Sequence, residues 1–262
     1  MTSEIHRRAA TGYLGSSFPH NMFRLSGMDL RLLLALLWLK ASAIDVTKDP
    51  EAVAKLTMAA TQLDRLALLP SSADWTFDFT AQQFFYNWLP GGVTNMNAAT
   101  FPATRGNGLT LAMVNLGPCA MLPPHFHPRA ANWVVAVKGN TTTWMQEENG
   151  AHTIVTCLTP GKATIFPAGS MHMMANNECE PAQLVSALND EDAGTMNIGQ
   201  IFTNGFAAEW VNAAFGGNFV DDNTAEKMPP VGTGANWGSA ECMSRCKIMP
   251  RDATGRPKEH GK

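Results

Sequence analysis

The chain has 262 residues, a net charge of −3, 45% hydrophobic residues and 16% charged residues. This length allows one large domain or two small ones with a substantial core, and the hydrophobic fraction excludes a wholly disordered chain. The low and slightly acidic charge gives no electrostatic basis for binding nucleic acid, so we expect no such partner. The 15 methionines and five cysteines are the features of composition that need an explanation.

The N-terminal region has the three parts of a secretory signal peptide. Arg24 and Arg31 precede the apolar run LLLALLWL at 32–39, and the small residues ASA at 41–43 follow it. A basic start, a short apolar core and an A-x-A end form the pattern of a cleaved signal. The run is too short for a membrane span, which needs about 20 residues. We therefore predict a signal peptide with an upstream extension at 1–43, a secreted protein and no membrane anchor.

The cysteines all follow the predicted signal peptide, so they would meet an oxidising environment and are disulfide candidates. Two bridges and one free thiol allow 15 arrangements, so the connectivity stays open. If each of the last two cysteines bridged elsewhere, the C-terminus would be tied to the body of the protein. A zinc site is the alternative, although no C-x-x-C pair is present. The candidates are Cys119, Cys157, Cys179, Cys242 and Cys246.

The mature chain should begin with a helical arm at 44–74. Asp49 suits an N-cap and Pro50 suits the first helical position. Apolar residues then repeat at helical spacing over 53–66, and Pro70 ends the pattern. We predict one continuous helix here.

From residue 75 the sequence changes to short strands separated by turn residues such as Gly139 and Asn140. Many short strands at nearly regular spacing are typical of a sandwich or small barrel. We predict an all-β barrel at 75–203, followed by a helical C-terminal extension and tail at 204–262. The predicted strands are Leu109–Leu116, Asn132–Lys138, Thr141–Gln146, His152–Leu158, Ala163–Phe166, His172–Ala175 and Gln183–Leu188, and the late helices are Ala207–Ala214 and Ser239–Lys247.

Asn140 begins the N-glycosylation sequence Asn-Thr-Thr and lies at the predicted turn between two strands. A surface turn of a secreted protein is accessible to the glycosylation machinery. We therefore predict that Asn140 carries a glycan.

Three histidines occupy positions that suit a metal centre. His125 and His127 form an H-x-H pair in PPHFHP, and side chains two residues apart on a strand point to the same face. His172 in PAGSMH, on another strand, would complete a set of three nitrogen ligands. Neutral imidazoles suit Mn, Fe, Cu, Ni or Zn. The alternative is that these histidines are ordinary core or surface residues.

The residues around these histidines form two ordered motifs, G-x5-PPHFH-x4-N-x6-G from Gly117 and G-x5-P-x-G-x2-H-x3-N from Gly161. They resemble the paired motifs of the cupin superfamily, and of its germin-like branch in particular. The segments GPC, HPRA, CEPA and a C-terminal C-x3-C extend the resemblance to secreted fungal spherulin-type proteins over 49–246. The resemblance implies a cupin double-stranded β-helix (a jelly-roll barrel), a helical C-terminus used in homo-oligomer contacts, and a metal in the barrel mouth.

One signature position departs from the germin-like pattern. Germin-like oxalate oxidases hold manganese with three histidines and a glutamate, and Asn132 stands at the position of that acid. An amide offers a neutral oxygen, so a hard cation such as Mn²⁺ should bind more weakly and at a shifted potential. We expect a divalent transition metal (Mn, Zn or Cu) on His125, His127 and His172, with Asn132 as a weak fourth ligand, or no metal at all.

The strand alternation also predicts the residues of a pocket. If His172 faces inward, so do the residues two and four positions after it. By the same rule, if Asn132 faces inward, so does the residue two positions after it. A weakly charged pocket containing methionine suits an apolar or aromatic small molecule. The alternative is that these methionines only fill gaps in the core. The predicted pocket residues are Asn132, Val134, Met174, Asn176 and Phe126.

Three functions are compatible with these observations. The first is an enzyme that cyclises, isomerises or cleaves a small, apolar or aromatic metabolite by non-hydrolytic chemistry, as in secondary metabolism; here the three histidines would be catalytic. The second is a manganese-dependent germin-like oxidoreductase of the oxalate oxidase or superoxide dismutase type. The third is a non-catalytic extracellular or spore-associated binding protein.

Overall fold

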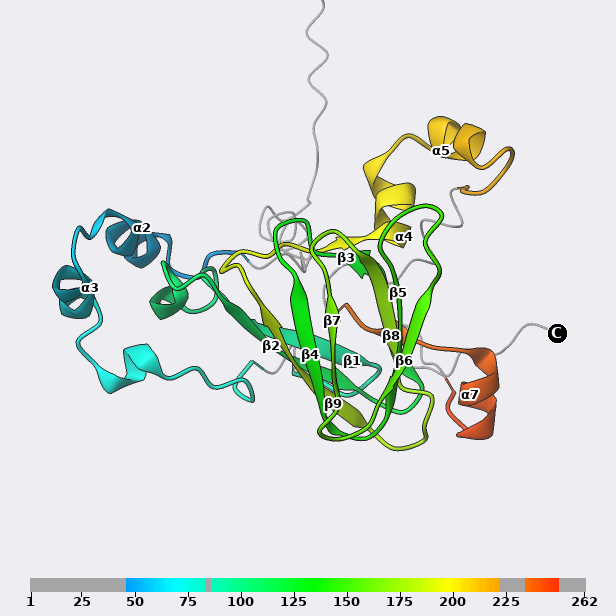
Figure 1. The fold of residues 1–262 in the computed structure, drawn as a ribbon, viewed down its shortest axis with the longest axis horizontal. Coiled ribbons are helices and arrows are strands. Elements are labelled where there is room, and N and C mark those ends of the chain that lie inside the picture. Colours follow the sequence, from blue (N-terminus) through cyan, green and yellow to red (C-terminus); the bar gives the residue numbers. More distant parts are fainter. Residues whose placement is uncertain (1–45, 83–85, 222–233, 250–262) are drawn as a thin grey trace, which may run out of the picture. The chain divides into compact units, whose positions relative to one another are not determined.

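The computed structural model of the chain describes residues 46–82, 86–221 and 234–249, whose helices and strands are shown in Figure 1. The predicted signal peptide at 1–43 and the last residues of the predicted tail lie outside this part of the chain. Of the helices in the described ranges, none is long and apolar enough to cross a membrane.

The N-terminal arm contains α2 (Pro50–Met58), α3 (Gln62–Leu68) and the 3₁₀ helix η1 (Ser72–Trp75). As predicted, Asp49 caps α2, because its carboxylate accepts a hydrogen bond from the backbone amide three residues on. The prediction of one continuous helix is wrong. The Thr61 hydroxyl accepts from the Asp64 amide, and the Asp64 carboxylate accepts from the Thr61 amide. This reciprocal capping starts a second helix despite the continuous apolar spacing.

The described strands pair into two antiparallel sheets with the orders β1-β2-β9-β4-β7 and β10-β3-β8-β5-β6, and β11 also pairs with β3. This is the all-β barrel that the sequence predicts. Each predicted strand is present, with ends that agree within two residues. The strands are β1 (Gly91–Met96), β2 (Thr110–Leu116), β3 (Ala120–Phe126), β4 (Asn132–Lys138), β5 (Thr141–Gln146), β6 (Ile154–Leu158), β7 (Ala163–Phe166), β8 (Met171–Ala175), β9 (Ala182–Leu188), β10 (Met196–Asn197) and β11 (Asn236–Trp237).

Strand β3 carries His125 and leads directly into His127, but it was not among the predicted strands. Its sequence contains Pro123 and Pro124, and proline cannot donate to a sheet ladder. The structure accommodates both prolines in an irregularity of the β3–β8 pairing between Leu122 and His125. Proline is tolerated at such a bulge because the ladder is already interrupted there.

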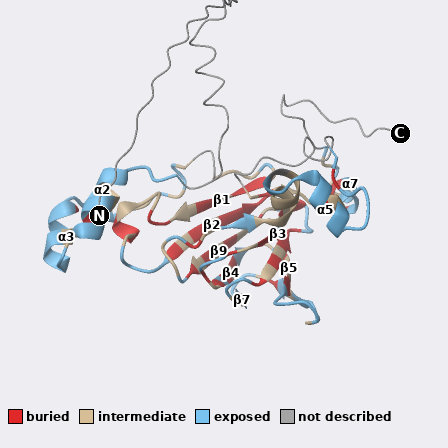
Figure 2. Ribbon diagram, turned by 90° about the horizontal axis from the view of Figure 1, so that it is seen from above, coloured by how far each residue is buried: buried red, intermediate tan, exposed pale blue. Residues whose placement is uncertain are grey.

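The core lies between the two sheets, where alternate residues of each strand face inward. In β9, for example, Ala182, Leu184, Ser186 and Leu188 are buried, and the residues between them are partly exposed. Figure 2 shows the buried residues concentrated on the strands, while α2, α3 and α5 are mostly exposed. The η2 turn (Pro102–Thr104) and the C-terminal elements α4 (Ile198–Gln200), the π-helix η3 (Ile201–Gly205), α5 (Ala208–Ala214) and α7 (Ala240–Arg245) complete the described structure.

Two disulfides tie the C-terminal helix α7 to the barrel. Cys119 is bonded to Cys242 and Cys179 to Cys246, while Cys157 is free and exposed on β6. The structure thus selects one arrangement from the open set. Because these four sulfur atoms are in disulfide bonds, they are not available as ligands for the alternative zinc site.

We predict that replacing both Cys119 and Cys242 with serine lowers the free energy of unfolding by about 2–5 kcal/mol. The bridge joins residues 123 positions apart, so its loss frees a long loop in the unfolded chain. Urea and thermal unfolding under non-reducing conditions measure the effect. Cys157→Ser is the control, and it should change the stability by less than about 0.5 kcal/mol because the side chain is exposed. Equal stability of the two variants would contradict this account.

Candidate functional site

The three predicted histidines meet inside the barrel. His125 near the end of β3 lies opposite His172 on the neighbouring strand β8, and His127 follows directly after β3. All three side chains are buried. Each offers one ring nitrogen as a possible ligand, and these three nitrogen atoms lie within 4.8 Å of one another. The ring centroids of His125 and His172 are 4.3 Å apart. The bulge in β3 and the β3–β8 pairing therefore assemble a compact cluster.

Backbone carbonyls fix the tautomer of each imidazole. Nδ1 of His125 lies 2.7 Å from the Pro123 oxygen, and Nδ1 of His172 lies 3.0 Å from the Ser170 oxygen. Nδ1 of His127 lies 2.7 Å from the Gly194 oxygen. Because a carbonyl oxygen can only accept, each Nδ1 must carry the hydrogen, and each Nε2 keeps its lone pair. This is the arrangement that orients a histidine for metal binding through Nε2.

Phe166 of β7 further fixes the His172 ring, since the two rings are stacked with centroids 4.1 Å apart and planes 7° from parallel. Nε2 of His172 is buried and has no hydrogen-bond partner in the described structure. A buried nitrogen lone pair without a partner costs free energy unless something binds it.

Burial keeps the three imidazoles uncharged. It lowers the pKa of His172 to about 4, with a smaller contribution from neighbouring His127. Burial is also the main cause that lowers the pKa of His127, and together with the other two imidazoles it holds the pKa of His125 well below its usual range. At neutral pH all three therefore offer lone pairs rather than protons.

Asn132, at the start of β4, reaches the same cluster. Its amide nitrogen lies 3.5 Å from Nε2 of His127, and its Oδ1 atom is buried without a hydrogen-bond partner in the described structure. The sequence prediction that an uncharged amide stands beside the histidines thus describes the observed geometry. The residues fit a divalent transition metal, because three uncharged imidazoles present unprotonated Nε2 atoms and an unpartnered oxygen lies beside them.

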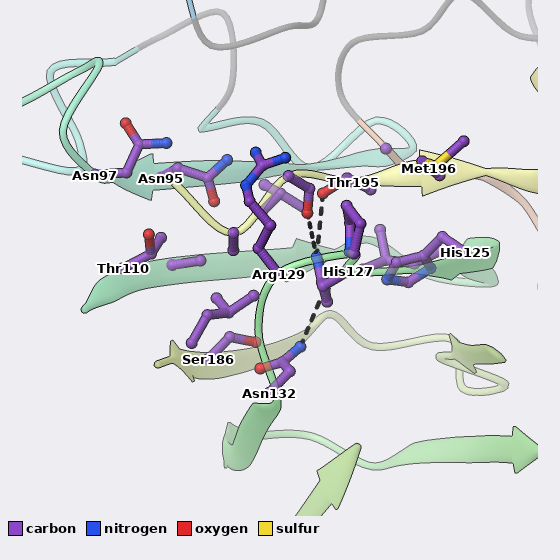
Figure 3. A pocket seen from close by; sticks show the side chains of 18 of the residues that line it. Asn95, Asn97, Thr110, His125, His127, Arg129, Asn132, Ser186, Thr195 and Met196 are labelled. Carbon is purple, nitrogen blue, oxygen red and sulfur yellow. Dashed lines mark hydrogen bonds between the residues drawn. The ribbon is translucent and has the colours of Figure 1, made fainter. Parts of the chain in front are cut away.

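The cluster borders a cavity of about 450 Å³, seen from close by in Figure 3. His125, His127, Asn132 and Met174 line it, as predicted from the strand alternation. Of the described lining residues, Arg129 and Asp192 alone carry charged side chains, and they form an ion pair at 3.0 Å. The further lining residues are Val93, Asn95, Asn97, Thr110, Ala112, Val114, Leu122, Pro128, Ser186, Leu188, Ala193, Gly194, Thr195, Met196, Asn197 and Gly234.

The structure places three predicted pocket residues elsewhere. Val134 is fully buried in the core between the sheets, and Phe126 is half-buried at the end of β3. Asn176 faces inward, but its amide nitrogen donates to the backbone oxygens of Gly117 and Glu180. Phe126 lies between His125 and His127, so alternation itself turns its side chain away from them, and Asn176 lies two positions beyond the lining residue Met174. Alternation predicts which face a residue occupies but not which inward side chains border the cavity.

Most of the residues that the sequence analysis missed come from β1, β2, β9 and the loop 189–195, and the others lie after β1, on or after β3, on β10 and at position 234. Ser186 of β9 is buried against the cavity, and β9 was a predicted strand whose inward face could have revealed it. Asn95 lies on β1, which was not predicted, and no local pattern indicates that Gly194 approaches His127.

Comparison with known proteins defines the family. A cupin family model matches residues 79–222. The chain is 34% identical over 204 residues to spherulin-1B from Physarum polycephalum, covering 77% of this chain and 81% of the relative. The chain belongs to the cupin family. Germin-like protein subfamily 3 member 1 from Arabidopsis thaliana is 31% identical over 56% of this chain and 71% of its own length, which supports the predicted germin-like, spherulin-type branch of the cupins.

Solved cupin structures share the fold at low identity. Oxalate decarboxylase from Bacillus subtilis at pH 4.6 matches 57% of this cupin and 37% of its own chain, with a TM-score of 0.51 and 17% identity. An oxalate oxidase structure matches 60% of this chain and 82% of its own, with a TM-score of 0.50 and 20% identity. At this identity the comparison supports the barrel architecture alone.

We predict that the metal-free protein loses stability as the pH falls from about 6.5 toward 4. The unfolded chain binds protons at His172 near the ordinary pKa of 6.5, whereas the folded chain resists protonation until the pH approaches about 4. His172→Gln should remove about 2–3 kcal/mol of this pH-dependent change, since one pKa unit corresponds to about 1.4 kcal/mol. Urea unfolding of both proteins across this range measures the difference. Parallel profiles would contradict the assignment.

Proposed function

We propose that this cupin is a secreted enzyme that converts a small, uncharged and largely apolar or aromatic molecule by non-hydrolytic chemistry of the cyclisation, isomerisation or lyase type. The observation that carries the proposal is the charge of the cavity. Three uncharged imidazoles and the Asn132 amide form the cluster, and Arg129 and Asp192 neutralise each other at the rim. The described side chains of the lining therefore supply no net charge of their own to balance a dicarboxylate such as oxalate.

The side chains of the cavity divide into walls and polar groups. Ala112, Val114, Leu122 and Met174 provide apolar walls that exclude water and favour an apolar ligand body. Asn132 Oδ1 is a free acceptor, and Ser186, buried two strand positions from it on the adjacent strand, adds a hydroxyl. These groups would orient a ligand that carries a hydroxyl or carbonyl group.

His125, His127 and His172 would hold a divalent transition metal, and Asn132 would be a weaker fourth ligand. When bound, such a metal supplies Lewis-acid polarisation of a substrate oxygen. The chain's own part is to keep three Nε2 atoms free of protons, to seat the substrate beside them and to keep water out. The neutral amide at Asn132 favours this role over manganese redox chemistry, because no carboxylate stabilises a higher oxidation state.

Export, glycosylation and self-association belong to the same proposal. Two disulfides suit an oxidising compartment, and Asn140 is exposed in the turn between β4 and β5. Phe206 and Trp210 of the C-terminal extension are 60% and 70% exposed, and such apolar side chains support association between copies of the chain. The expected partners are thus a small-molecule substrate and further copies of this protein.

Elemental analysis and one pair of variants test the metal assignment. We expect one zinc, copper or other divalent transition metal per chain in the purified protein and no oxalate oxidation. Asn132→Glu should raise the affinity for Mn²⁺ by about tenfold or more, about 1.4 kcal/mol for each factor of ten, because it restores an anionic ligand. Asn132→Gln is the matched control, which adds the same length without charge and should not raise that affinity. Stoichiometric manganese with oxalate oxidation in the unaltered protein would overturn the proposal in favour of a manganese oxidoreductase.

Two probe ligands test the charge argument. The uncharged aromatic ketone 2-hydroxyacetophenone should bind the metal-free protein more tightly than the oxalate dianion, because the walls are apolar and the lining without a metal has no net charge. Isothermal titration calorimetry measures both affinities. Ser186→Ala should weaken binding of the ketone about fivefold to tenfold, which is the effect of one lost hydrogen bond. The variant protein should bind metal with unchanged affinity. Tighter binding of oxalate would contradict a preference for uncharged ligands.

A further inference from the structure

The three histidines differ in how their rings are held. The carbonyls that accept from His125 and His172 belong to residues two positions earlier in the same segment, so the local backbone orients these rings. The carbonyl that accepts from His127 belongs to Gly194, 67 residues away in the chain. Thr195 places its hydroxyl 3.3 Å from the same nitrogen. The orientation of His127 therefore depends on the loop at 189–195, which we call the rim loop.

Gly194 meets an unusual set of constraints. Its φ of +68° lies in the left-handed region, which favours glycine. A Cβ atom there would lie 2.8 Å from Nη2 of Arg129 and 3.1 Å from the Pro128 ring. The backbone can thus approach Arg129 and turn its carbonyl toward His127 only because this residue has no side chain.

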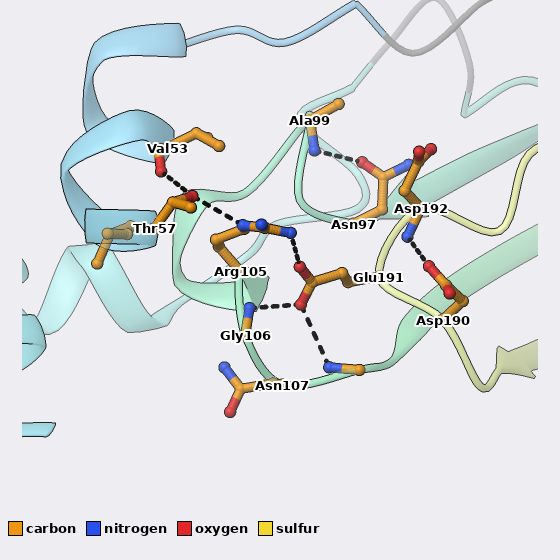
Figure 4. A network of polar contacts seen from close by, with 12 residues as sticks. Val53, Thr57, Asn97, Ala99, Arg105, Gly106, Asn107, Asp190, Glu191 and Asp192 are labelled. Carbon is orange, nitrogen blue, oxygen red and sulfur yellow. Dashed lines mark hydrogen bonds and ion pairs between the residues drawn. The ribbon is translucent and has the colours of Figure 1, made fainter. Parts of the chain in front are cut away.

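Glu191, a residue of the rim loop, attaches this loop to neighbouring segments outside the barrel. The Glu191 carboxylate accepts a hydrogen bond from the backbone amide of Gly106 and forms an ion pair with Arg105, as Figure 4 shows. It also accepts from the backbone amide of Gly108 at 3.3 Å. Its side chain is only 12% exposed, so this charge is largely removed from water and needs these partners. The Glu191 backbone oxygen also accepts from the amide of Ala98 at 3.0 Å.

Arg105 in turn is held by the N-terminal arm. Its Nε donates to the Thr57 hydroxyl of α2 at 2.9 Å, and its backbone oxygen accepts from the Arg65 guanidinium of α3. A second nitrogen of Arg65 donates to the Leu56 oxygen at 2.9 Å. A continuous series of polar contacts therefore runs from the arm through Arg105 and Glu191 to the rim loop.

We infer that the Arg105–Glu191 ion pair is a positioning device for His127, through which the N-terminal arm controls one of the three ligand positions. The pair fixes the rim loop, the rim loop places the Gly194 carbonyl, and that carbonyl selects the Nδ1–H tautomer of His127. His125 and His172 are independent of this series, because their acceptors are local. The inference rests on the proposed metal site but not on the identity of its substrate.

The tautomers of the metal-free protein test this inference directly. Long-range ¹H–¹⁵N NMR of the histidine rings should show the Nδ1–H form at all three positions in the unaltered chain. In Glu191→Gln we expect His127 to populate both tautomers, while His125 and His172 keep one. The affinity for Zn²⁺, measured by competition with a chelator, should fall about tenfold. Glu241→Gln is the matched control, since it breaks an exposed ion pair with Arg245 on α7 and should change neither measurement.

Two further variants keep the test decisive. Gly194→Ala should give the same selective change at His127, because it displaces the acceptor itself. If Glu191→Gln does not accumulate as a folded protein, the milder Arg105→Lys replaces it with the same expectation. A folded Glu191 variant with an unchanged His127 tautomer and unchanged Zn²⁺ affinity would overturn the inference, as would an equal response of all three histidines. If the unaltered chain binds no metal, the proposed function fails, but the tautomers still decide the inference.

Discussion

The site depends on one constraint, which is that three uncharged imidazoles are buried around a common point with their Nε2 atoms unprotonated. The backbone satisfies it by placing a carbonyl oxygen at each Nδ1, so that the ring hydrogen is held on the side away from the cluster. Burial then makes protonation costly, and the stacked ring of Phe166 prevents His172 from turning. The bulge in β3 and the pairing of His125 with His172 supply the necessary spacing.

The charge of the cavity follows from the same constraint. In a germin-like site of three histidines and one acid, the carboxylate would offset part of the charge of a bound metal. Here Asn132 offers an oxygen without charge, and Arg129 is already paired with Asp192. The protein's own contribution to ligand selectivity therefore comes from the shape of the cavity, its apolar walls and a few neutral polar groups. We therefore propose a different class of substrate for this chain, although oxalate oxidase and oxalate decarboxylase share its barrel architecture.

Segments outside the barrel also contribute to the order of the site. The rim loop supplies both lining residues and the acceptor for His127, and the N-terminal arm holds it through Arg105 and Glu191. The disulfides anchor α7 against the barrel on other loops. Contacts from the N-terminal arm thus add to those within the barrel that hold the rim loop beside His127.

The sequence by itself determined the family, most strand positions, the three histidines and the neutral residue at Asn132, because these follow from local spacing and strand alternation. It did not determine the break between α2 and α3, the strand through Pro123 and Pro124, or the pairing of the cysteines. It placed Val134 and Asn176 in the pocket and missed Ser186, since alternation specifies a face and not which inward side chains border the cavity. Only the tertiary structure joined Gly194 to His127, because a contact across 67 residues depends on how the loops close over the barrel and leaves no local pattern.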